Sequence, residues 1–274
     1  MPLSRWSGPD PAGELAARRQ LAVSASAIGR WLAGDALKPW QHRSWISVRD
    51  PQFATRAAPV LDLYAGIWGG RPLGPDDYVI CADEKTSIQA RCRCHPTLPP
   101  GKARAMRVEH DYDRGGALAY LAAWDVHRGQ VTGRCEDTTG IAPFARLVAQ
   151  VMTAEPYASA DRVFWIVDNG SSHRGAASAE RMARAWPNAQ LIHLPVHASW
   201  LDQAEIYFSV VQRKALTPGD FTDLDQIRDR LAAFETRYNA IARPFNWKFT
   251  RTDLDDLLHR IDAHGSTQPH ALAA

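Results

Sequence analysis

The chain has 274 residues, of which 45% are hydrophobic and 23% are charged, and its formal net charge is +2. This composition is typical of a folded globular protein and excludes disordered and low-complexity classes. No apolar run approaches the roughly 18 residues of a membrane span, and the first residues, MPLSRWSGPDPAG, lack the apolar core of a signal peptide. We therefore expect a cytoplasmic protein with no membrane partner.

The four cysteines, Cys81, Cys92, Cys94 and Cys135, are too few and too irregularly spaced for a disulfide framework. They favour a reducing compartment. Cys92 and Cys94 stand one residue apart, which does not give the CxxC geometry of structural zinc sites, and no second pair follows. We therefore expect no zinc site.

Residues 1–50 are predicted to form a small helical segment. Ser24 or Ser26 can cap its second helix, because a serine hydroxyl accepts a hydrogen bond from an unpaired backbone N–H. Two short helices about a tight connection indicate a helix-turn-helix, in which Ser26 and Arg30 would face a DNA major groove and Ile28 the interior. The same pattern also fits a helical pair in a bundle, so the prediction of a partial DNA-binding segment needs further support.

Residues 51–75 are predicted to comprise a linker and a helix from Phe53 to Trp68. The stretch that leads into them, LKPWQHRSWISVRDPQF, mixes tryptophans and basic residues with prolines, as a semi-rigid linker does. Its Lys38 and Arg43 are further candidate DNA contacts.

Three predicted strands and a helix follow. Val79–Cys81 form the first strand, and Asp83 comes just after it. Residues 117–126 and 130–135 form an antiparallel hairpin about the turn HRG. A helix at residues 141–153 then leads to the next strand.

The stretch FWIVDNGSSHRG contains a fourth strand. Phe164–Val167 have the aromatic and β-branched character of a strand buried on both faces, and Asn169-Gly170 supplies the turn that closes it. Asp168 therefore lies at the carboxyl end of a central strand, where ligands bind in open α/β sheets. Taken alone, such an aspartate more often caps a helix or bends a turn.

A helix at residues 176–186, a short strand in AQLIHLPV and a long helix complete this part of the pattern. The long helix is predicted to run from a Ser199 cap to Leu216, and it carries Glu205. Two amphipathic helices near the C terminus are predicted to form an outer layer.

The order of these elements predicts an α/β fold of the ribonuclease H-like type, a mixed five-stranded sheet with flanking helices, preceded by the small helix-turn-helix segment. The catalytic domain is predicted to span residues 76–240, and residues 241–274 to form a C-terminal helical extension. The first and fourth strands of this fold lie side by side. Asp83 and Asp168 would then point into one cleft, and the helix with Glu205 would pack across it.

Three converging carboxylates repel one another and require a compensating positive charge. Mg²⁺ is a hard, octahedral ion that binds carboxylate oxygens, and two such ions can hold the attacking and leaving oxygens of a displacement at phosphorus. The pattern therefore predicts metal-dependent phosphodiester cleavage or transfer, with Asp83, Asp168 and Glu205 as catalytic residues and metal ligands. The competing interpretation is three unrelated turn and surface acids.

Residues 85–108 contain six basic residues and no acid. The six are Lys85, Arg91, Arg93, Lys102, Arg104 and Arg107. Most charge runs are solvated loops. A basic segment beside an acidic centre would instead attract a polyanion such as a phosphate backbone, so we predict that this segment contacts DNA.

Five segments match a known family in order, spacing and flanking residues: ADEKTSIQA, GALAYLAAWDVHRGQV, IVDNGSSHRG, HASWLDQAEIYFSVVQRKAL and YNAIARPFNWKFT. Over residues 26–255 the chain resembles the DDE transposases of bacterial insertion sequences in the mariner superfamily, of the insertion sequence six-thirty type. The resemblance implies a DNA transposase that cuts double-stranded DNA at terminal inverted repeats and joins the ends to a TA target.

The resemblance also implies how the chemistry is done. Asp83, Asp168 and Glu205 would bind Mg²⁺, with Mn²⁺ as the alternative ion, and water or a DNA 3′ hydroxyl would be the nucleophile. A homodimer on paired DNA ends and a nucleoid-associated location are implied as well.

Two departures from the family pattern bear on function. Asp202 stands where the family usually has asparagine, three residues before Glu205, so a fourth acid either lies near the cleft or faces solvent. Family members usually carry two helix-turn-helix units, and this sequence begins just before what resembles the second. An inactive, N-terminally truncated remnant that only binds DNA is therefore the alternative function, and a structure-specific nuclease of the same fold is another.

Two histidines flank the acids. His173 follows Asp168 by five residues, and His197 precedes Glu205 by eight. Each could orient water, contact a DNA phosphate or serve a purely structural role.

Overall fold

The computed structural model describes residues 7, 9–34, 48, 50–102, 104–170, 172–173 and 175–265. The chain forms two compact units, residues 1–47 and residues 48–274. The first unit contains two helices that contact each other, α1 (Pro9–Arg19) and α2 (Ala25–Gly34). The Ser24 hydroxyl accepts a hydrogen bond from the Ala27 N–H at 3.1 Å, so Ser24 is the helix cap. Ile28 is buried, as predicted for the inner face of the second helix.

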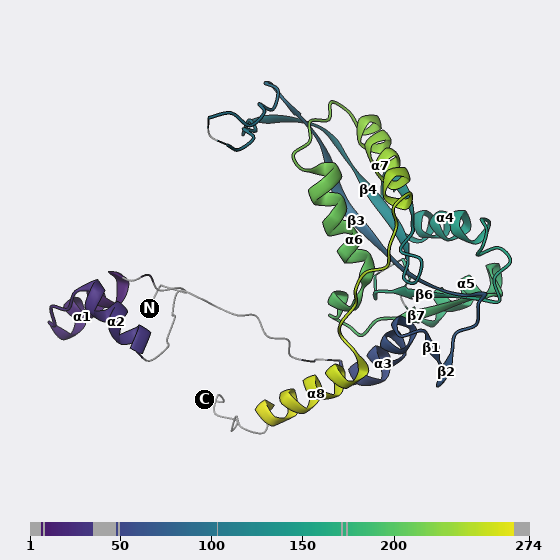
Figure 1. The fold of residues 1–274 in the computed structure, drawn as a ribbon, viewed down its shortest axis with the longest axis horizontal. Helices are drawn as coiled ribbons and strands as arrows, with labels where there is room; N and C mark the ends of the chain where they lie inside the picture. Colours follow the sequence, from purple (N-terminus) through teal and green to yellow (C-terminus); the bar gives the residue numbers. More distant parts are fainter. Residues whose placement is uncertain are drawn as a thin grey trace. The chain divides into compact units, whose positions relative to one another are not determined.

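The second unit is built on a mixed five-stranded sheet (Figure 1). Its strands are β3 (Asp77–Arg93), β4 (Tyr112–Asp125), β5 (Val131–Glu136), β6 (Arg162–Val167) and β7 (Ala189–His193). The strand order is β5, β4, β3, β6, β7, with β3, β6 and β7 parallel and β4 antiparallel to both of its neighbours. The first of these strands therefore pairs with the fourth, which confirms the predicted ribonuclease H-like sheet. A separate two-stranded hairpin, β1 (Ile67–Trp68) and β2 (Arg71–Pro72), precedes it.

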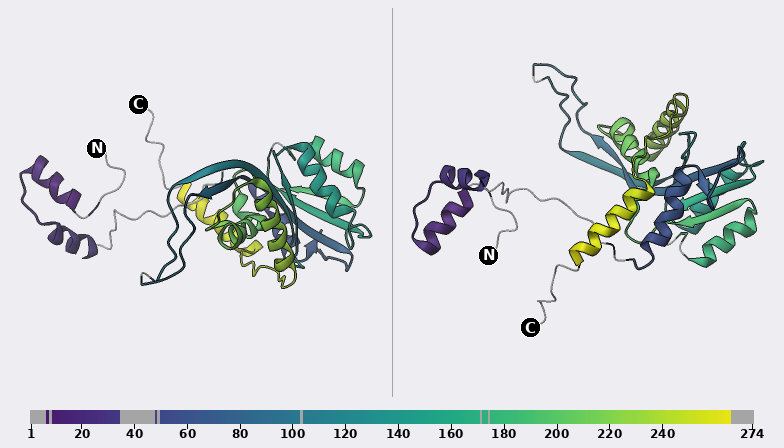
Figure 2. Two further views of the ribbon diagram at one scale, coloured as in Figure 1. Left: turned by 90° about the horizontal axis from the view of Figure 1, so that it is seen from above. Right: turned by 60° about the horizontal axis from the view of Figure 1, so that its bottom comes forward.

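Helices cover both faces of the sheet (Figure 2). On one face, α3 (Phe53–Tyr64), α6 (Gln203–Val211) and α7 (Leu224–Asn239) form the first core. On the other, α4 (Ile141–Met152) and α5 (Ala176–Ala185) form the second core. Side chains of β3 alternate between the two cores, with Val79 and Cys81 in the first and Ile80 and Ala82 in the second. Burial on both faces explains why β6 is an unbroken apolar run.

Strands β3 and β4 continue well beyond the rest of the sheet as a two-stranded extension, residues 86–117, which we call the arm (Figure 1). β3 pairs with β6 only as far as Ala82. Beyond that, its pairing with β4 shifts register between Lys85 and Ile88, and again between Gln89 and Arg91. The predicted strands at 79–81 and 117–126 were therefore too short. Their apolar runs mark the most continuously buried part of each strand. In the arm, Ile88 and Ala90 still pack into the first core, and pairing between β3 and β4 holds the remaining, more polar residues.

Two helix predictions were wrong at their ends. α3 stops at Tyr64 and not at Trp68, because Gly66 turns the chain with a φ of 73° and the next residues form β1. The helix predicted to run from Ser199 to Leu216 is broken into a 3-10 turn (Ser199–Leu201), α6 and a π-helical turn (Gln212–Leu216). The cap of α6 is consequently Asp202, whose side chain accepts the Ala204 N–H.

The last helix, α8 (Arg251–Gly265), packs against α3 and buries Leu254 in the first core. An ion pair between Arg251 and Asp62, at 3.3 Å, joins the two helices. None of the described helices has both the length and the apolar character needed to cross a membrane.

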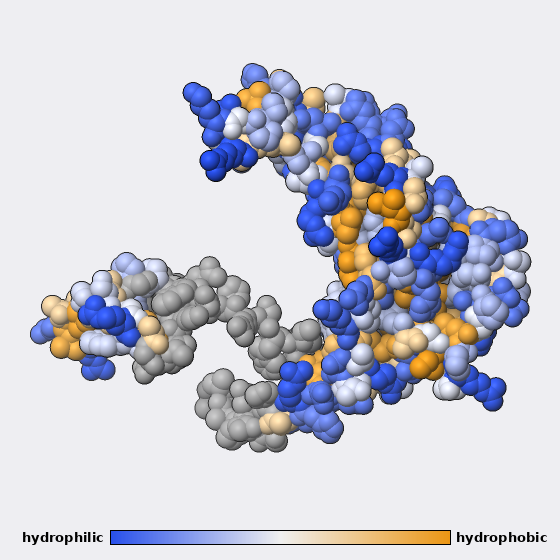
Figure 3. Space-filling view, viewed as in Figure 1, coloured by the Kyte–Doolittle hydropathy of each residue, from blue (hydrophilic) through white to orange (hydrophobic). Residues whose placement is uncertain are grey.

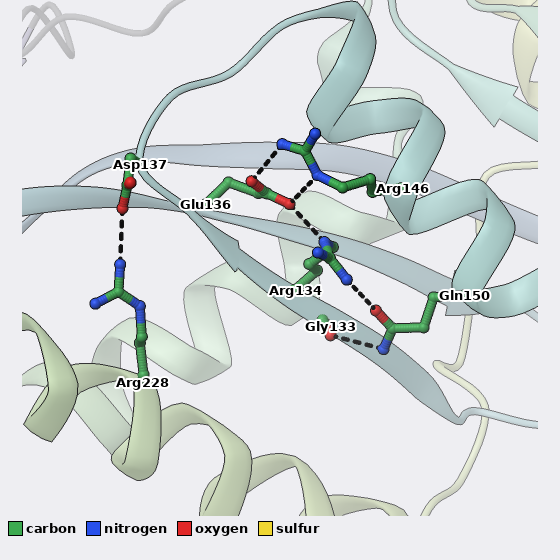
Figure 4. A network of polar contacts seen from close by, with 7 residues as sticks. All are labelled: Gly133, Arg134, Glu136, Asp137, Arg146, Gln150 and Arg228. Atoms are coloured by element: carbon green, nitrogen blue, oxygen red, sulfur yellow. Dashed lines mark hydrogen bonds and ion pairs between the residues drawn. The ribbon is translucent and has the colours of Figure 1, made fainter.

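Glu136, at the end of edge strand β5, fastens this strand to α4 (Figure 4). Its carboxylate accepts hydrogen bonds from Arg146 Nε at 2.8 Å and Nη2 at 2.6 Å, and from Arg134 Nε at 2.5 Å. The bonds from Arg146, with a smaller contribution from Arg134, lower the pKa of Glu136 to about 2. Next to it, Asp137 accepts a bond from Arg228 of α7 at 2.7 Å. The edge strand is thus attached to helices on both faces.

We expect Glu136→Gln to lower the free energy of unfolding by about 1 kcal/mol at pH 7, because both arginines are partly exposed and screened. The folded pKa of Glu136 lies below its ordinary value of 4.5, so the ionised carboxylate stabilises the fold above that pH. This contribution should disappear as the pH falls through about 2. Urea denaturation of wild type and variant at several pH values measures it.

The matched control is Glu180→Gln, on the exposed surface of α5. It should leave the free energy of unfolding unchanged over the same pH range. The role of this ion pair would be contradicted if the difference in free energy of unfolding between wild type and Glu136→Gln did not shrink in acid.

Candidate active site

Two acids meet where β6 ends beside the middle of β3. The parallel register pairs Ala82 with Val167, and the residue that follows each of them is an aspartate, Asp83 and Asp168. Asp83 follows Cys81 by two positions, so it lies on the face of the first core. Pairing of the two strands therefore brings the two aspartates together at the carboxyl edge of β6, as predicted.

A third acid, Glu205, comes from the first turn of α6. Ala204 and Tyr207 are buried in the first core and hold this helix against the sheet. Asp202 accepts the Ala204 N–H at 2.8 Å, and its own N–H bonds to the Ser199 carbonyl at 2.8 Å. Glu205 is therefore not needed to cap the N terminus of α6, and its side chain remains exposed. The helix dipole at this N terminus favours a carboxylate.

The charges of the three acids act on one another. Burial raises the pKa of Asp83 to about 7, and repulsion from Glu205, Asp168 and Glu84 adds to this effect. A hydrogen bond from the Glu84 N–H at 2.8 Å opposes the rise without cancelling it. Glu205 and Asp168 are therefore near enough to destabilise the Asp83 anion, and a cation at this position would relieve that repulsion.

Asp168 has the opposite shift. A hydrogen bond from His173 lowers its pKa, and the Gly170 N–H also bonds its Oδ1, at 2.6 Å. A Cβ on residue 170 would lie 2.8 Å from that same oxygen and 3.0 Å from His173 Nε2. Glycine is therefore the residue that fits between the carboxylate and the imidazole. His173 is fully buried, so it can contact neither DNA nor bulk solvent.

Asp202 does not face solvent. It is 1% exposed, and burial raises its pKa well above the usual range, with repulsion from Asp83, Glu205 and Asp168 adding to the rise. Its Oδ2 is buried without a partner among the described residues. Asp202, the fourth acid, is therefore buried beside the cleft, where it caps the N terminus of α6.

Glu84 is an acid that the sequence analysis did not identify as a site residue. It lies on the opposite face of β3 from Asp83, and its Oε2 is buried without a partner among the described residues. Burial raises its pKa, the electrostatic interaction with His173 lowers it, and the interaction with Asp168 raises it. The sequence signal for Glu84 is its place directly after Asp83. Side chains alternate along a strand, so two adjacent acids lie on opposite faces of the sheet.

The donor set suits a hard divalent cation, because all of its atoms are carboxylate oxygens. Asp83, Asp168 and Glu205 are the residues that could hold one, and their mutual repulsion is the chemical evidence that they fit it. As the described side chains stand, no three His, Cys, Asp or Glu residues have a geometry that would hold a metal. The three acids therefore do not form a complete metal site until at least one of them moves.

The predicted DNA contacts are distributed over both units. Ser26 and Arg30 are exposed on α2, and Lys38 and Arg43 lie outside the described residues. Lys102, Arg104 and Arg107 are exposed in the arm, whose outer end carries hydrophilic residues beside a few exposed hydrophobic ones (Figure 3). His197 is exposed, with a φ of 62°, and none of the described contacts joins it to the three acids.

The remaining basic residues lie on β3. Lys85 lines a hollow together with Glu205 and Arg213. Arg91 is exposed and lies over the Tyr112 ring, 4.9 Å from its centroid. Arg93 is instead engaged within the protein. It bonds to the Glu109 and Gly219 carbonyls at 2.9 and 2.8 Å and to Asp220 at 2.5 Å, which fastens the arm to the loop before α7.

The opposite pKa shifts of the two aspartates predict opposite effects on stability at pH 8. Because the folded pKa of Asp83 lies above its ordinary 3.8, ionising it destabilises the fold as the pH rises from about 4 to about 7. Asp83→Asn should therefore raise the free energy of unfolding at pH 8, by about 2 kcal/mol. Asp168→Asn should lower it, because the ionised carboxylate is the form that His173 stabilises.

Urea denaturation in EDTA at pH 4 and pH 8 tests this pair of variants, each serving as the control for the other. At pH 4, Asp83→Asn should change the free energy of unfolding only slightly, because the wild-type carboxyl is already protonated. Equal effects of the two substitutions at pH 8 would rule out the electrostatic arrangement described above.

Comparison with known proteins agrees with this geometry. The family model for the DDE superfamily endonuclease matches residues 78–228, more than half of the chain, and this stretch includes Asp83, Asp168 and Glu205. Comparison with curated proteins gave no match.

Among solved structures, the chain is similar to the Mos1 mariner paired end complex with Mn, at 14% identity and a TM-score of 0.54, covering 96% of this chain and 78% of that one. The complex with Mg is 16% identical, with a TM-score of 0.53 and coverages of 97% and 80%. The Mos1 strand transfer complex is 14% identical, with a TM-score of 0.52 and coverages of 96% and 78%. These likenesses establish the fold, and with the family match they lead to one conclusion: the chain belongs to the DDE superfamily endonucleases.

Proposed function

We propose that this protein is a DNA transposase that cleaves phosphodiester bonds at terminal inverted repeats and transfers the strand ends into target DNA. The observation that carries the proposal is the convergence of Asp83, Asp168 and Glu205 on one sheet edge within a DDE endonuclease domain. We further propose that it acts in a bacterial insertion sequence of the six-thirty type and joins the ends at a TA target. The resemblance of the motifs supports this finer assignment.

Asp83, Asp168 and Glu205 would hold divalent ions, Mg²⁺ or, alternatively, Mn²⁺. Two such ions would supply positive charge for the attacking and leaving oxygens of the displacement at phosphorus. The hard oxygen donors and the mutual repulsion of the acids support this part of the proposal. The similar Mos1 complexes contain Mn and Mg, which is consistent with it.

The residues of this chain prepare the site in different ways. The hydrogen bond from His173 favours the ionised form of Asp168, which is the form that binds a cation. Asp83 holds a proton up to a pH of about 7 and must release it when a cation binds. Glu205 reaches the cleft from the positive end of α6, and Asp202 fixes that helix end.

DNA would lie along the basic residues that flank this cleft. Lys85 and Arg213 border the hollow next to Glu205, and Lys102, Arg104 and Arg107 extend the positive charge into the arm. Ser26 and Arg30 of α2 would contribute contacts from the helical unit. We propose a homodimer on paired DNA ends, in line with the paired end complexes of Mos1.

The decisive test is cleavage of a labelled duplex that carries the inverted repeat flanking the gene, with Mg²⁺, Mn²⁺ or EDTA. We expect metal-dependent cutting at the repeat end. Asp83→Asn, Asp168→Asn and Glu205→Gln should each reduce the rate by at least about 100-fold, since each removes a ligand of the reacting ions. The exposed Glu180→Gln is the matched control and should cut like wild type.

The outcomes separate the alternatives. Binding of the repeat without cutting would replace the transposase proposal with a DNA-binding remnant. Metal-dependent cutting that ignores the repeat would point to a structure-specific nuclease. Cutting that survives the substitutions of the three acids would refute the site.

The contribution of the arm can be measured separately. We expect Lys102→Ala combined with Arg107→Ala to reduce the slope of log binding constant against log salt by about 1 to 2, since each phosphate contact contributes about 0.9. The charge-matched control is Arg184→Ala with Arg237→Ala, two exposed positions on other elements. Equal slopes for the arm variant and wild type would exclude the arm from the DNA interface.

A further inference from the structure

The loop after β6 holds His173 rigidly. The residue is fully buried, and its carbonyl accepts hydrogen bonds from Ser178 Oγ at 2.5 Å and from His193 Nε2 at 2.6 Å. Its ring packs against Phe144 of α4, with the ring centroids 5.1 Å apart. Groups from α5, β7 and α4 therefore fix the backbone and the ring together.

Both ring nitrogens of His173 have a partner. Nε2 bonds to Asp168 Oδ1, and Nδ1 lies 2.9 Å from Ser172 Oγ. An ionised carboxylate can only accept, so Nε2 must carry the proton. In the neutral ring Nδ1 is then the acceptor, and the buried hydroxyl of Ser172 donates to it. The hydrogen-bond network thereby selects one tautomer.

The same network divides the two oxygens of Asp168 between two tasks. Oδ1 accepts from His173 and, at 2.6 Å, from the Gly170 N–H. No hydrogen bond or ion pair of the described residues reaches Oδ2, and the side chain as a whole is 43% exposed. One oxygen is therefore held by the protein, and the other is left for the cleft.

We infer that His173 is a positioning residue, which fixes the rotation of the Asp168 carboxylate so that Oδ2 is presented to a divalent cation. The identity of that ligand rests on the proposed function, whereas the hydrogen-bond arrangement does not. Ser172 contacts the His173 ring at Nδ1 and holds it in the tautomer that donates to Asp168. Loss of such an outer partner weakens metal binding by about 10- to 100-fold in known sites.

The test measures the affinity of the full chain for Mn²⁺ without DNA, by electron paramagnetic resonance titration. His173→Leu fills the volume without a donor and should raise the Kd about 10- to 100-fold. His173→Gln places an amide N–H near the position of Nε2 and should restore most of the affinity. The matched control is Glu180→Gln, an exposed position on α5 that should leave the Kd unchanged.

A second measurement reads the tautomer directly. Long-range ¹H–¹⁵N spectra of the wild-type imidazoles should show His173 protonated at Nε2 and unprotonated at Nδ1. A neutral ring protonated at Nδ1 would overturn the inference, and this holds even if His173→Leu does not fold. Unchanged Mn²⁺ affinity in a folded leucine variant would overturn it as well, whereas a wild type that binds no Mn²⁺ would refute the proposed function instead.

Discussion

The parallel pairing of β3 with β6 is the constraint on which the site depends. It ends at Ala82 and Val167, so the next residue of each strand is an acid at the same edge of the sheet. Close packing of β6 against both cores fixes this register, because a slip by one residue would exchange side chains of different size between the cores, such as Phe164 and Trp165. The same apolar packing that stabilises the fold thus sets the spacing of two carboxylates that repel each other.

Around this pairing, the protein gives two chemically identical side chains different electrostatic environments. Asp83 lies on a continuous strand in a partly buried position and receives a single backbone hydrogen bond, so its anion is disfavoured. Asp168 lies on a turn, where an N–H and an imidazole converge on one oxygen, so its anion is favoured. Apart from the Glu84 N–H, no hydrogen bond from the described residues reaches the Asp83 carboxylate. The difference therefore follows from where each acid stands in the secondary structure.

The sequence predicted those features that depend on local apolar patterns. The runs at 79–81 and 164–167 located the central strands, and the acids after them, which the strand pairing brings to one edge, form the candidate site. The arm was missed because its buried residues on β3, Ile88 and Ala90, are few and separated by polar ones, and because its pairing partner β4 is distant in sequence. The break before α6 was missed for a similar reason, since Ser199 resembles a cap until the tertiary position of Asp202 is known. The burial of Asp202 and the engagement of Arg93 depend on residues far apart in the chain, so no short motif encodes them.

The length of β3 has a mechanical consequence. Asp83 and the arm belong to one uninterrupted strand, which runs from Asp77 in the sheet to Arg93. A load on the arm therefore reaches the carboxylate through covalent backbone and not through a loop that could absorb it. Between the two, the pairing with β4 is first interrupted at the register shift between Lys85 and Ile88. Displacement of the arm is therefore transmitted to Asp83 through only the two residues that separate it from this irregularity.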